Sequence, residues 1–287
     1  MMIQDAAREI RQKLGQLYDE GEACAIGDWL LEHLTGTRRK DRYVRREESL
    51  DPQQVIKMNN AIERLLKHEP VQYVLSEAWF CGLKFYVDSR VLIPLPETEE
   101  LVEWIIANCR FPVSELRILD VGCVSGCISI SLKRRLGKAE VWGCDQSAGA
   151  LEVSSRNATQ LGVDVRFERI DFLDPAQADQ LPSFDIIVSN PPYIPETEKE
   201  KLDRNVTAHE PHMALFVPDN DPLVFYRAIA RFGKTHLHGG GNIFFEIHEE
   251  LGSAVSELLK NEGYVAELKK DMSGKDRMIK AVITGKR

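Results

Sequence analysis

The stretch RILDVGCVSGC, residues 117–127, decides the fold of this chain. Its first five residues form a short apolar run that is typical of a buried strand. Gly122 then lets the backbone turn sharply, and Gly126 allows the next helix to begin close to a ligand. Two glycines after a strand also occur in ordinary tight turns, and Val124 stands where a middle glycine is usual. The loop alone is therefore weak evidence for a nucleotide site.

Strand-like and helix-like patterns alternate along the rest of the chain. Helical stretches such as 148–160 and 222–232 separate further apolar, strand-like runs, which lie at 139–145, 165–169, 184–189 and 242–247. This alternation predicts parallel strands with helices on both faces, a Rossmann-like α/β fold. Two more strand-like runs, 264–268 and 278–284, are joined only by a loop. They predict an antiparallel C-terminal hairpin at the edge of a seven-stranded sheet.

The first 75 residues lack strand-like runs and show helical spacing instead. Ile10, Leu14 and Leu17 lie at i, i+4 and i+7, which places them on one helix face. Asp51-Pro52 is a favourable helix start, because a capping side chain precedes proline at the first helical position. We expect three parts, which are a small helical domain at 1–75, a β-hairpin linker at 76–95 and the α/β domain at 96–287.

The composition is that of an ordinary globular protein, with 43% hydrophobic and 29% charged residues. No run approaches the ~20 apolar residues of a membrane helix, and the first residues lack the apolar stretch of a secretory signal. Six cysteines without paired spacing suit a reducing compartment, so we expect the cytoplasm. The net charge of −8 argues against a protein that binds nucleic-acid phosphates directly. We interpret the basic run Arg38–Arg46 as a solvated helix end or loop.

Acidic and aromatic residues follow the next two strands at positions that suit an adenosine-containing cofactor. Asp145 ends the second strand, 25 residues after Asp120, where a carboxylate accepts hydrogen bonds from two ribose hydroxyls. An ordinary helix-capping aspartate is the alternative interpretation. Asp171 could accept from the adenine amino group, and Phe172 could pack on its ring. The predicted cofactor residues are Asp120, Gly122, Gly126, Asp145, Asp171 and Phe172.

The tetrapeptide Asn190-Pro191-Pro192-Tyr193 follows the fourth strand and carries the chemistry. Its two prolines remove two N–H donors and leave their carbonyls free to accept. The Asn190 side-chain oxygen and the Pro191 carbonyl can then hold both hydrogens of a substrate NH2 group, while Tyr193 covers its flat face. Acceptors aimed at these hydrogens favour the partly positive nitrogen of a methyl-transfer transition state, so no strong general base is needed. We predict transfer from S-adenosylmethionine, which leaves S-adenosylhomocysteine.

A proline-rich turn after a strand is the plain alternative, since Asn-Pro and Pro-Pro are common turn dipeptides. The ordered combination with Asp120, Gly122, Gly126 and Asp145 is far more specific. We therefore predict that Asn190, Pro191 and Tyr193 act in catalysis and that Asn190–Tyr193 bind the substrate, with Asn190 also lining the cofactor site. The same tetrapeptide serves enzymes that act on adenine N6, on cytosine N4 and on a glutamine amide.

From Glu69 onward the chain resembles the release-factor glutamine N5-methyltransferase family (HemK/PrmC). The matching segments are Glu69–Val74, Phe85–Asp88, Val91–Val102, Asp120–Cys127, Asn190–Ile194, Glu210–Leu215, Phe225–Arg227 and Ser273–Arg277. The resemblance implies a class I methyltransferase domain at 96–287 and, as substrate, the glutamine of the Gly-Gly-Gln motif of peptide-chain release factors. It also implies that the N-terminal domain docks this protein partner.

Two positions depart from the family pattern. Leu95 stands where the family usually has arginine, and Val124 stands where it has glycine. These departures leave open a catalytically weakened paralogue that still binds the cofactor. An N6-adenine DNA or RNA methyltransferase is the other alternative, although it would need a basic groove and room for a flipped base. We expect no membrane partner and a monomer.

We predict no metal site. His209 and His212 flank a glutamate but lack further ligands, and the spacing of Cys123 and Cys127 suits packing better than zinc.

Overall fold

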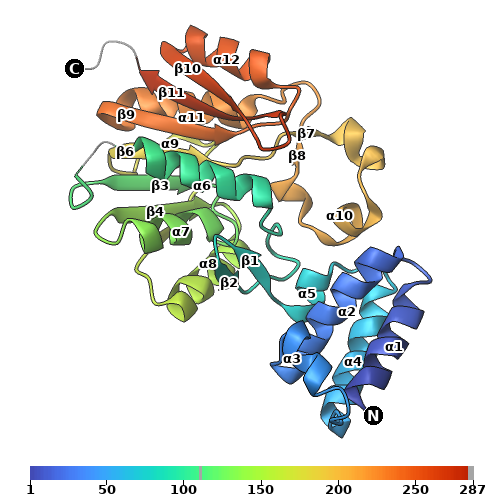
Figure 1. The fold of residues 1–287 in the computed structure, drawn as a ribbon. Coiled ribbons are helices and arrows are strands. Elements are labelled where there is room, and N and C mark those ends of the chain that lie inside the picture. Colours follow the sequence, from blue (N-terminus) through green and yellow to red (C-terminus); the bar gives the residue numbers. More distant parts are fainter. Residues whose placement is uncertain (110–111, 284–287) are drawn as a thin grey trace. The chain divides into compact units, whose positions relative to one another are not determined.

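The computed structural model describes residues 1–109 and 112–283, and the chain divides into two compact units (Figure 1). One unit comprises Met1–Glu77 together with Asp203–His209, and the other comprises Ala78–Leu202 together with Glu210–Arg287. The β-hairpin that we expected as a linker belongs to the second unit. Residue 284, the predicted end of the last strand, lies outside the described residues.

The first unit is helical. Its helices are α1 (Ile3–Leu14), α2 (Glu20–Thr35), α3 (Arg39–Val44), α4 (Pro52–Leu65), α5 (Val71–Leu75) and α10 (Arg204–His209). Asp51 forms a capping box with Gln54 at the start of α4, as its sequence predicts. Ile10 and Leu14 are fully buried, but α1 ends at Leu14 and Leu17 is exposed. The prediction that Leu17 continues the buried face is therefore wrong.

The basic run at 38–46 is partly internal. Arg42 is only 5% exposed and donates to Asp28 Oδ1 at 2.6 Å and to the Thr37 carbonyl at 2.9 Å. Arg39 also pairs with Asp28, and Arg45 pairs with Glu48. Arg39 and Arg42 therefore join α3 to α2, and Arg42 is not the solvated residue that we expected.

The second unit is a seven-stranded sheet in the order β10-β11-β9-β6-β3-β4-β5. The strands are β3 (Arg117–Val121), β4 (Glu140–Asp145), β5 (Arg166–Arg169), β6 (Phe184–Ser189), β9 (Leu237–Glu246), β10 (Tyr264–Lys270) and β11 (Asp276–Ile283). The first five of these strands are parallel, whereas β11 runs antiparallel to both β9 and β10. The predicted α/β fold with an antiparallel C-terminal hairpin is confirmed.

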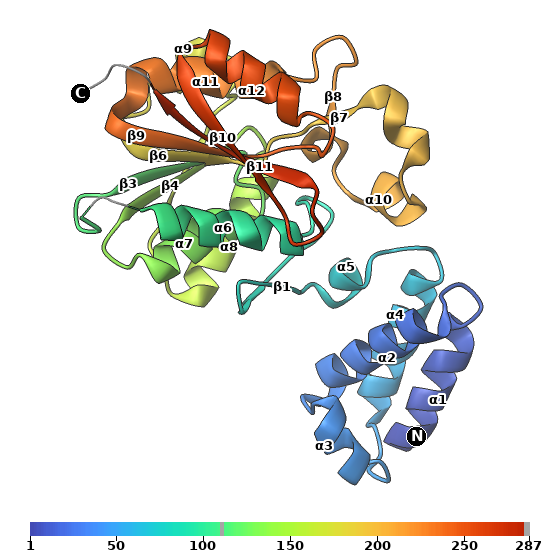
Figure 2. The same cartoon turned by 45° about the horizontal axis from the view of Figure 1, so that its top comes forward.

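Helices cover both faces of this sheet (Figure 2). On one face lie α6 (Pro96–Asn108), α7 (Cys127–Arg135) and α8 (Ala148–Leu161); on the other lie α9 (Pro175–Ala178), α11 (Val224–His236) and α12 (Gly252–Asn261). Each face has its own apolar core, with Leu101 and Ile130 in one and Ile229 and Val255 in the other. Because the central strands β3, β4 and β6 are buried on both faces, they read as nearly continuous apolar runs, whereas the outer strands β5 and β10 are more exposed.

Short elements complete the second unit. The antiparallel pair β1 (Ala78–Phe80) and β2 (Leu83–Phe85) confirms the hairpin predicted around Gly82. The segment after the tetrapeptide contains β7 (Ile194–Pro195), η1 (Glu196–Lys201), η2 (His212–Ala214) and β8 (Phe216–Val217). Strands β7 and β8 pair in parallel, so the chain returns beside the tetrapeptide after its excursion into the first unit.

Candidate active site

A cavity lies beyond the carboxyl ends of β3, β4 and β6, where the strand order reverses. Its lining includes most of the predicted cofactor and substrate residues, which are Gly122, Asp145, Asp171, Phe172, Asn190, Pro191 and Pro192. Asp120, Gly126 and Tyr193 are not among the residues that line it. The structure thus brings together side chains that the sequence spreads over seventy positions.

Asp145 ends β4 and presents a largely buried carboxylate to the cavity. It accepts the Val124 N–H at 3.1 Å and the Ser147 N–H at 2.8 Å. Burial raises its pKa above the usual aspartate value, and no cation is among the causes of this shift. Hydroxyl donors placed in the cavity would supply hydrogen bonds that favour the ionised form.

Gly122 and Val124 form the turn between β3 and α7, and both have positive φ values, +72° and +51°. No heavy atom lies within 4 Å of the place where a Cβ of Gly122 would stand, so a side chain there would project into the open cavity. Val124 is a β-branched residue in the left-handed region, where such side chains are strained. Val124 therefore keeps a backbone conformation that suits glycine, and its branched side chain forms part of the cavity wall.

Asp120 and Gly126 do not line the cavity but fix the start of α7 after the turn. Asp120 Oδ2 accepts the Ser129 N–H at 3.0 Å in the first turn of α7, and burial raises its pKa to about 7. Gly126 has a φ of +78°, and a Cβ there would stand 2.9 Å from Ile130 Cδ1 and 3.0 Å from Ser154 Cβ. Glycine at 126 thus allows α7 to begin close to α8.

Asp171 and Phe172 follow β5 at the far side of the cavity. Asp171 Oδ1 accepts the Leu173 N–H at 3.0 Å. The buried Phe172 ring packs edge-on against Phe232, with ring centroids 5.1 Å apart. This contact holds the aromatic wall of the cavity in place.

The tetrapeptide leaves β6 directly at the cavity edge. Ser189 Oγ donates to the Val121 carbonyl at 2.7 Å and ties this strand end to β3. Asn190 Nδ2 donates to Thr98 Oγ1 at 3.3 Å, while Pro191 and Pro192 line the cavity. Tyr193 is partly buried against the core, and its ring centroid lies 5.9 Å from that of His248. Burial raises the pKa of its hydroxyl well above the usual range, so the hydroxyl stays protonated at neutral pH.

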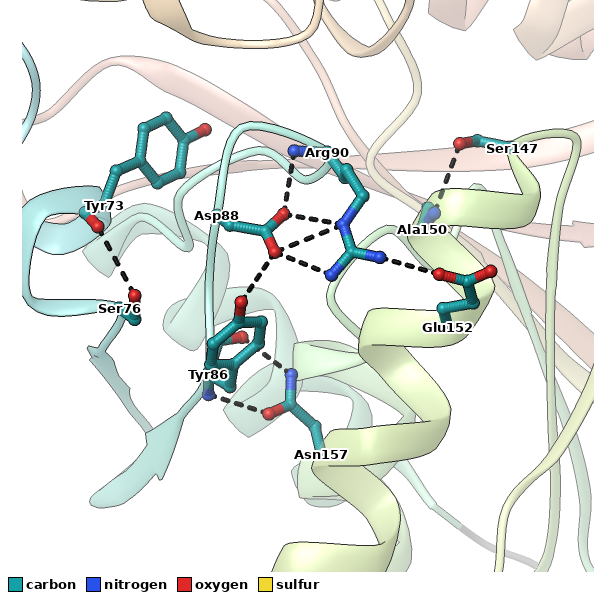
Figure 3. A network of polar contacts seen from close by, with 9 residues as sticks. All are labelled: Tyr73, Ser76, Tyr86, Asp88, Arg90, Ser147, Ala150, Glu152 and Asn157. Atoms are coloured by element: carbon teal, nitrogen blue, oxygen red, sulfur yellow. Dashed lines mark hydrogen bonds and ion pairs between the residues drawn. The ribbon is translucent and has the colours of Figure 1, made fainter.

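Sequence reasoning missed Arg90, which also lines the cavity. Asp88 accepts from its guanidinium at 2.7 Å and 2.9 Å, and Glu152 on α8 accepts at 2.7 Å. Arg90 holds the pKa of Asp88 down, to about 2. Just before this pair, Asn157 exchanges hydrogen bonds with the backbone of Tyr86. Figure 3 shows how these contacts fasten the segment after β2 to α8; no motif marks Arg90, because its role depends on partners across the fold.

The segment 210–214, which carries part of the family resemblance, also contributes to the cavity. Pro211, Met213 and Ala214 line it. Glu210 accepts the Ile93 N–H at 3.1 Å and thereby joins this segment to the chain just before Pro94. Burial raises the pKa of Glu210 to about 7. Leu95, the first departure from the family pattern, is 42% exposed and is not a lining residue.

The cavity residues fit the predicted cofactor. A largely buried carboxylate at the end of β4, an open glycine turn after β3 and an aromatic wall are arranged as an adenosine-containing ligand requires. Within residues 1–109 and 112–283, no group of three or more metal-ligating side chains comes together. His209 instead contacts the Lys67 carbonyl, and His212 packs edge-on against Phe216. None of the described helices is both long and apolar enough to cross a membrane.

Comparison with known proteins identifies the family. The model for the PrmC N-terminal domain matches residues 5–75, and that for the Methyltransferase small domain matches residues 98–209. The Release factor glutamine methyltransferase of Flavobacterium psychrophilum is 41% identical over 98% of this chain and 99% of its own length. That of Bacteroides thetaiotaomicron is 41% identical over 95% of this chain and 97% of its own.

Among solved structures, a methyltransferase from Pyrococcus furiosus covers 78% of this chain and 98% of its own, with a TM-score of 0.52 and 16% identity. That likeness concerns the fold alone. The sequence relatives are decisive, because they extend through both units and across every segment that lines the cavity. This chain belongs to the release factor glutamine methyltransferase family.

Proposed function

We propose that the protein transfers a methyl group from S-adenosylmethionine to the side-chain amide nitrogen of the glutamine in the Gly-Gly-Gln motif of peptide-chain release factors. The observation that carries this proposal is the position of Asn190-Pro191-Pro192 at the edge of a cavity that fits the cofactor. The names of its full-length relatives support the choice of protein substrate. We place the reaction in the cytoplasm and expect the enzyme to act as a monomer.

The residues at the cavity edge suit a weakly nucleophilic amide. The Asn190 side-chain oxygen and the Pro191 carbonyl would accept the two hydrogens of the glutamine NH2 group, and Tyr193 would pack against its flat face. Both acceptors favour the nitrogen as it becomes pyramidal and partly positive, which is when methyl transfer occurs. Fixing the amide at the cavity edge also supplies the alignment that the displacement requires.

S-Adenosylmethionine would supply an electrophilic methyl group at this edge. Asp145 would hold its ribose hydroxyls, Asp171 and Phe172 its adenine, and the turn at Gly122 its methionine end. These groups come from three strand ends of one sheet, and together they would orient the cofactor.

The test uses labelled S-adenosylmethionine with either a bacterial release factor or DNA. We expect label on the release factor, and we expect it to vanish when the tip glutamine is replaced by another residue. Asn190→Ala should lower transfer by about a hundredfold, because one of the two amide acceptors is lost. Label on DNA instead of the release factor would overturn the proposal.

A weakened paralogue is the second candidate, and one observation favours it: Val124, with a φ of +51°, adds a branched side chain to the cavity lining where the family has glycine. Cofactor binding measured by calorimetry, without transfer to either substrate, would support this candidate over the first.

A further inference from the structure

Behind the tetrapeptide lies a chain of buried polar groups that the proposed chemistry does not use directly. Glu246, at the end of β9, is 1% exposed, and Thr98, in the first turn of α6, is 3% exposed. Thr98 Oγ1 donates to Glu246 Oε2 at 2.7 Å and accepts from Asn190 Nδ2 at 3.3 Å. The Glu246 carboxylate also faces the Asn190 amide. The chain therefore runs from a buried acid to the rim of the cavity.

The direction of these hydrogen bonds is determined by the donors available. An ionised carboxylate only accepts, and a threonine hydroxyl has a single hydrogen to give. Thr98 gives that hydrogen to Glu246, so towards Asn190 its oxygen can only accept. Asn190 must then turn its NH2 group inward, and its oxygen is left to face the cavity.

We propose that Glu246 and Thr98 are positioning residues that set the polarity of the Asn190 amide, so that its oxygen rather than its NH2 group meets the substrate nitrogen. This inference rests on the proposed function for its catalytic meaning. It extends that function by naming the two residues that make Asn190 an acceptor.

Protonation of Glu246 would remove this constraint. A neutral carboxyl can donate to Thr98, whose hydrogen is then free for the Asn190 oxygen, and the amide can turn around. The outward NH2 group would then face the NH2 group of the substrate, and two donor groups cannot form the required hydrogen bond. Burial raises the pKa of Glu246 to about 7. The activity is therefore expected to rise with pH as this acid ionises.

Other charged and titratable groups also act on the Glu246 carboxyl. Arg277 on β11 favours its ionised form, and Glu97 on α6 opposes it. The Tyr226 hydroxyl donates to the backbone carbonyl of Glu246 at 3.1 Å, the Tyr193 hydroxyl also feels the charge of Glu246, and burial keeps both hydroxyls neutral. Among these neighbours Glu246 is the acid whose ionisation changes the hydrogen-bond direction at Asn190.

The first experiment compares Glu246→Gln with the wild type across the neutral pH range, using methyl transfer to the release factor. Glutamine has nearly the same shape but can offer Thr98 either a donor or an acceptor. We expect kcat to fall about a hundredfold, as when one preorganised group of this kind is lost. The rise of the wild-type rate through about pH 7 should also disappear. Wild-type kcat with the same pH profile would overturn the proposal.

A matched pair at position 98 guards against a merely structural effect. Thr98→Ser keeps the hydroxyl and should keep both the activity and the pH dependence, whereas Thr98→Val should lose both. Thermal unfolding of each variant shows whether it is folded. If Glu246→Gln does not fold, the comparison of Thr98→Ser with Thr98→Val tests the proposal by itself. Equal activities of the serine and valine variants would count against the proposal.

A measurement on Asn190 itself separates this proposal from the proposed function. The side-chain NH2 signals of Asn190 can be identified by NMR through their loss in Asn190→Ala. We expect these signals to shift with a midpoint near pH 7 in the wild type and not in Thr98→Val. If the wild type transfers no methyl group but this titration is seen, the function fails and the positioning stands. If the Asn190 NH2 signals do not shift with pH, the positioning role of Glu246 and Thr98 is overturned, even when the enzyme is active.

Discussion

Val124 shows how much one side chain can alter a turn without changing the fold. Its φ of +51° is ordinary for glycine and strained for a β-branched residue, at a cost of about 1–3 kcal/mol. The surrounding contacts nevertheless hold the turn, because the Val124 N–H donates to Asp145. The strain therefore lies within the wall of the cavity.

We predict that Val124→Gly tightens the binding of S-adenosylmethionine. Glycine takes up the positive φ freely and removes the branched side chain from the cavity wall. We expect Kd to fall roughly threefold to tenfold, which corresponds to about 1 kcal/mol. Titration calorimetry measures this change directly.

Val124→Ala is the matched control for this prediction, because alanine removes the branch but keeps the strained backbone. Tightening by glycine alone would assign the effect to the backbone, and tightening by both would assign it to crowding. If neither variant binds more tightly, Val124 does not limit the cofactor site.

At the scale of elements, the start of α7 depends on Gly126. A side chain there would have both an unfavourable φ and close contacts with Ile130 and Ser154. We predict that Gly126→Ala lowers the free energy of unfolding by about 3 kcal/mol, of which backbone strain contributes about 1–2 kcal/mol and crowding the rest. Urea denaturation followed by circular dichroism measures the loss.

Gly162 offers a control in the same unit. It ends α8 with a φ of +65°, and nothing lies within 4 Å of a Cβ added there. Gly162→Ala should therefore cost only the backbone strain, about 1 kcal/mol. Equal losses at the two positions would show that the contact between α7 and α8 contributes little.

The elements also show what could be predicted from the sequence and what could not. Strands such as Arg117–Val121 and Phe184–Ser189 were predicted within a residue, because their apolar runs are local. The strand at 242–247 begins earlier, at Leu237, where a glycine-rich stretch gives no apolar signal. The order of strands depends on pairing between distant segments, and no local pattern encodes it. The family resemblance supplied the class of sheet instead.

The same limit applies to the site. Residues at strand ends, such as Asp145 and Asn190, were predicted because a parallel sheet brings strand ends together. Glu246 and Thr98 were missed, since they are 148 positions apart and their hydrogen bond leaves no local pattern. Sequence patterns thus revealed the groups that face the cavity better than those that orient them.

For the molecule as a whole, buried acids predict an unusual dependence of stability on pH. Asp120, Glu210 and Glu246 each have a pKa raised to about 7 by burial. Because these carboxyls bind a proton more tightly in the folded state, they add to the free energy of unfolding. This addition is complete at pH values below the unfolded pKa values of 3.8 and 4.5, and it is lost as pH rises through 7. Asp88 acts in the opposite sense, but its contribution is lost only as pH falls towards 2. Thermal stability should therefore be higher at about pH 5.5 than at about pH 8.

Differential scanning calorimetry at the two pH values tests this expectation. Glu210→Gln should reduce the difference between the two midpoints, because an amide cannot titrate. A midpoint that is higher at the alkaline value in the wild type would contradict the prediction.

Residues 203–209 belong to the helical unit, and this affects the design of chimeras between this protein and its relatives. The unit is discontinuous in the chain, so a fragment that stops at Glu77 lacks α10. A chimera that exchanges only residues 1–77 with a relative would pair a foreign helical bundle with a native α10. Successful grafts should require both segments from one parent, as would any recombination event that evolution retained.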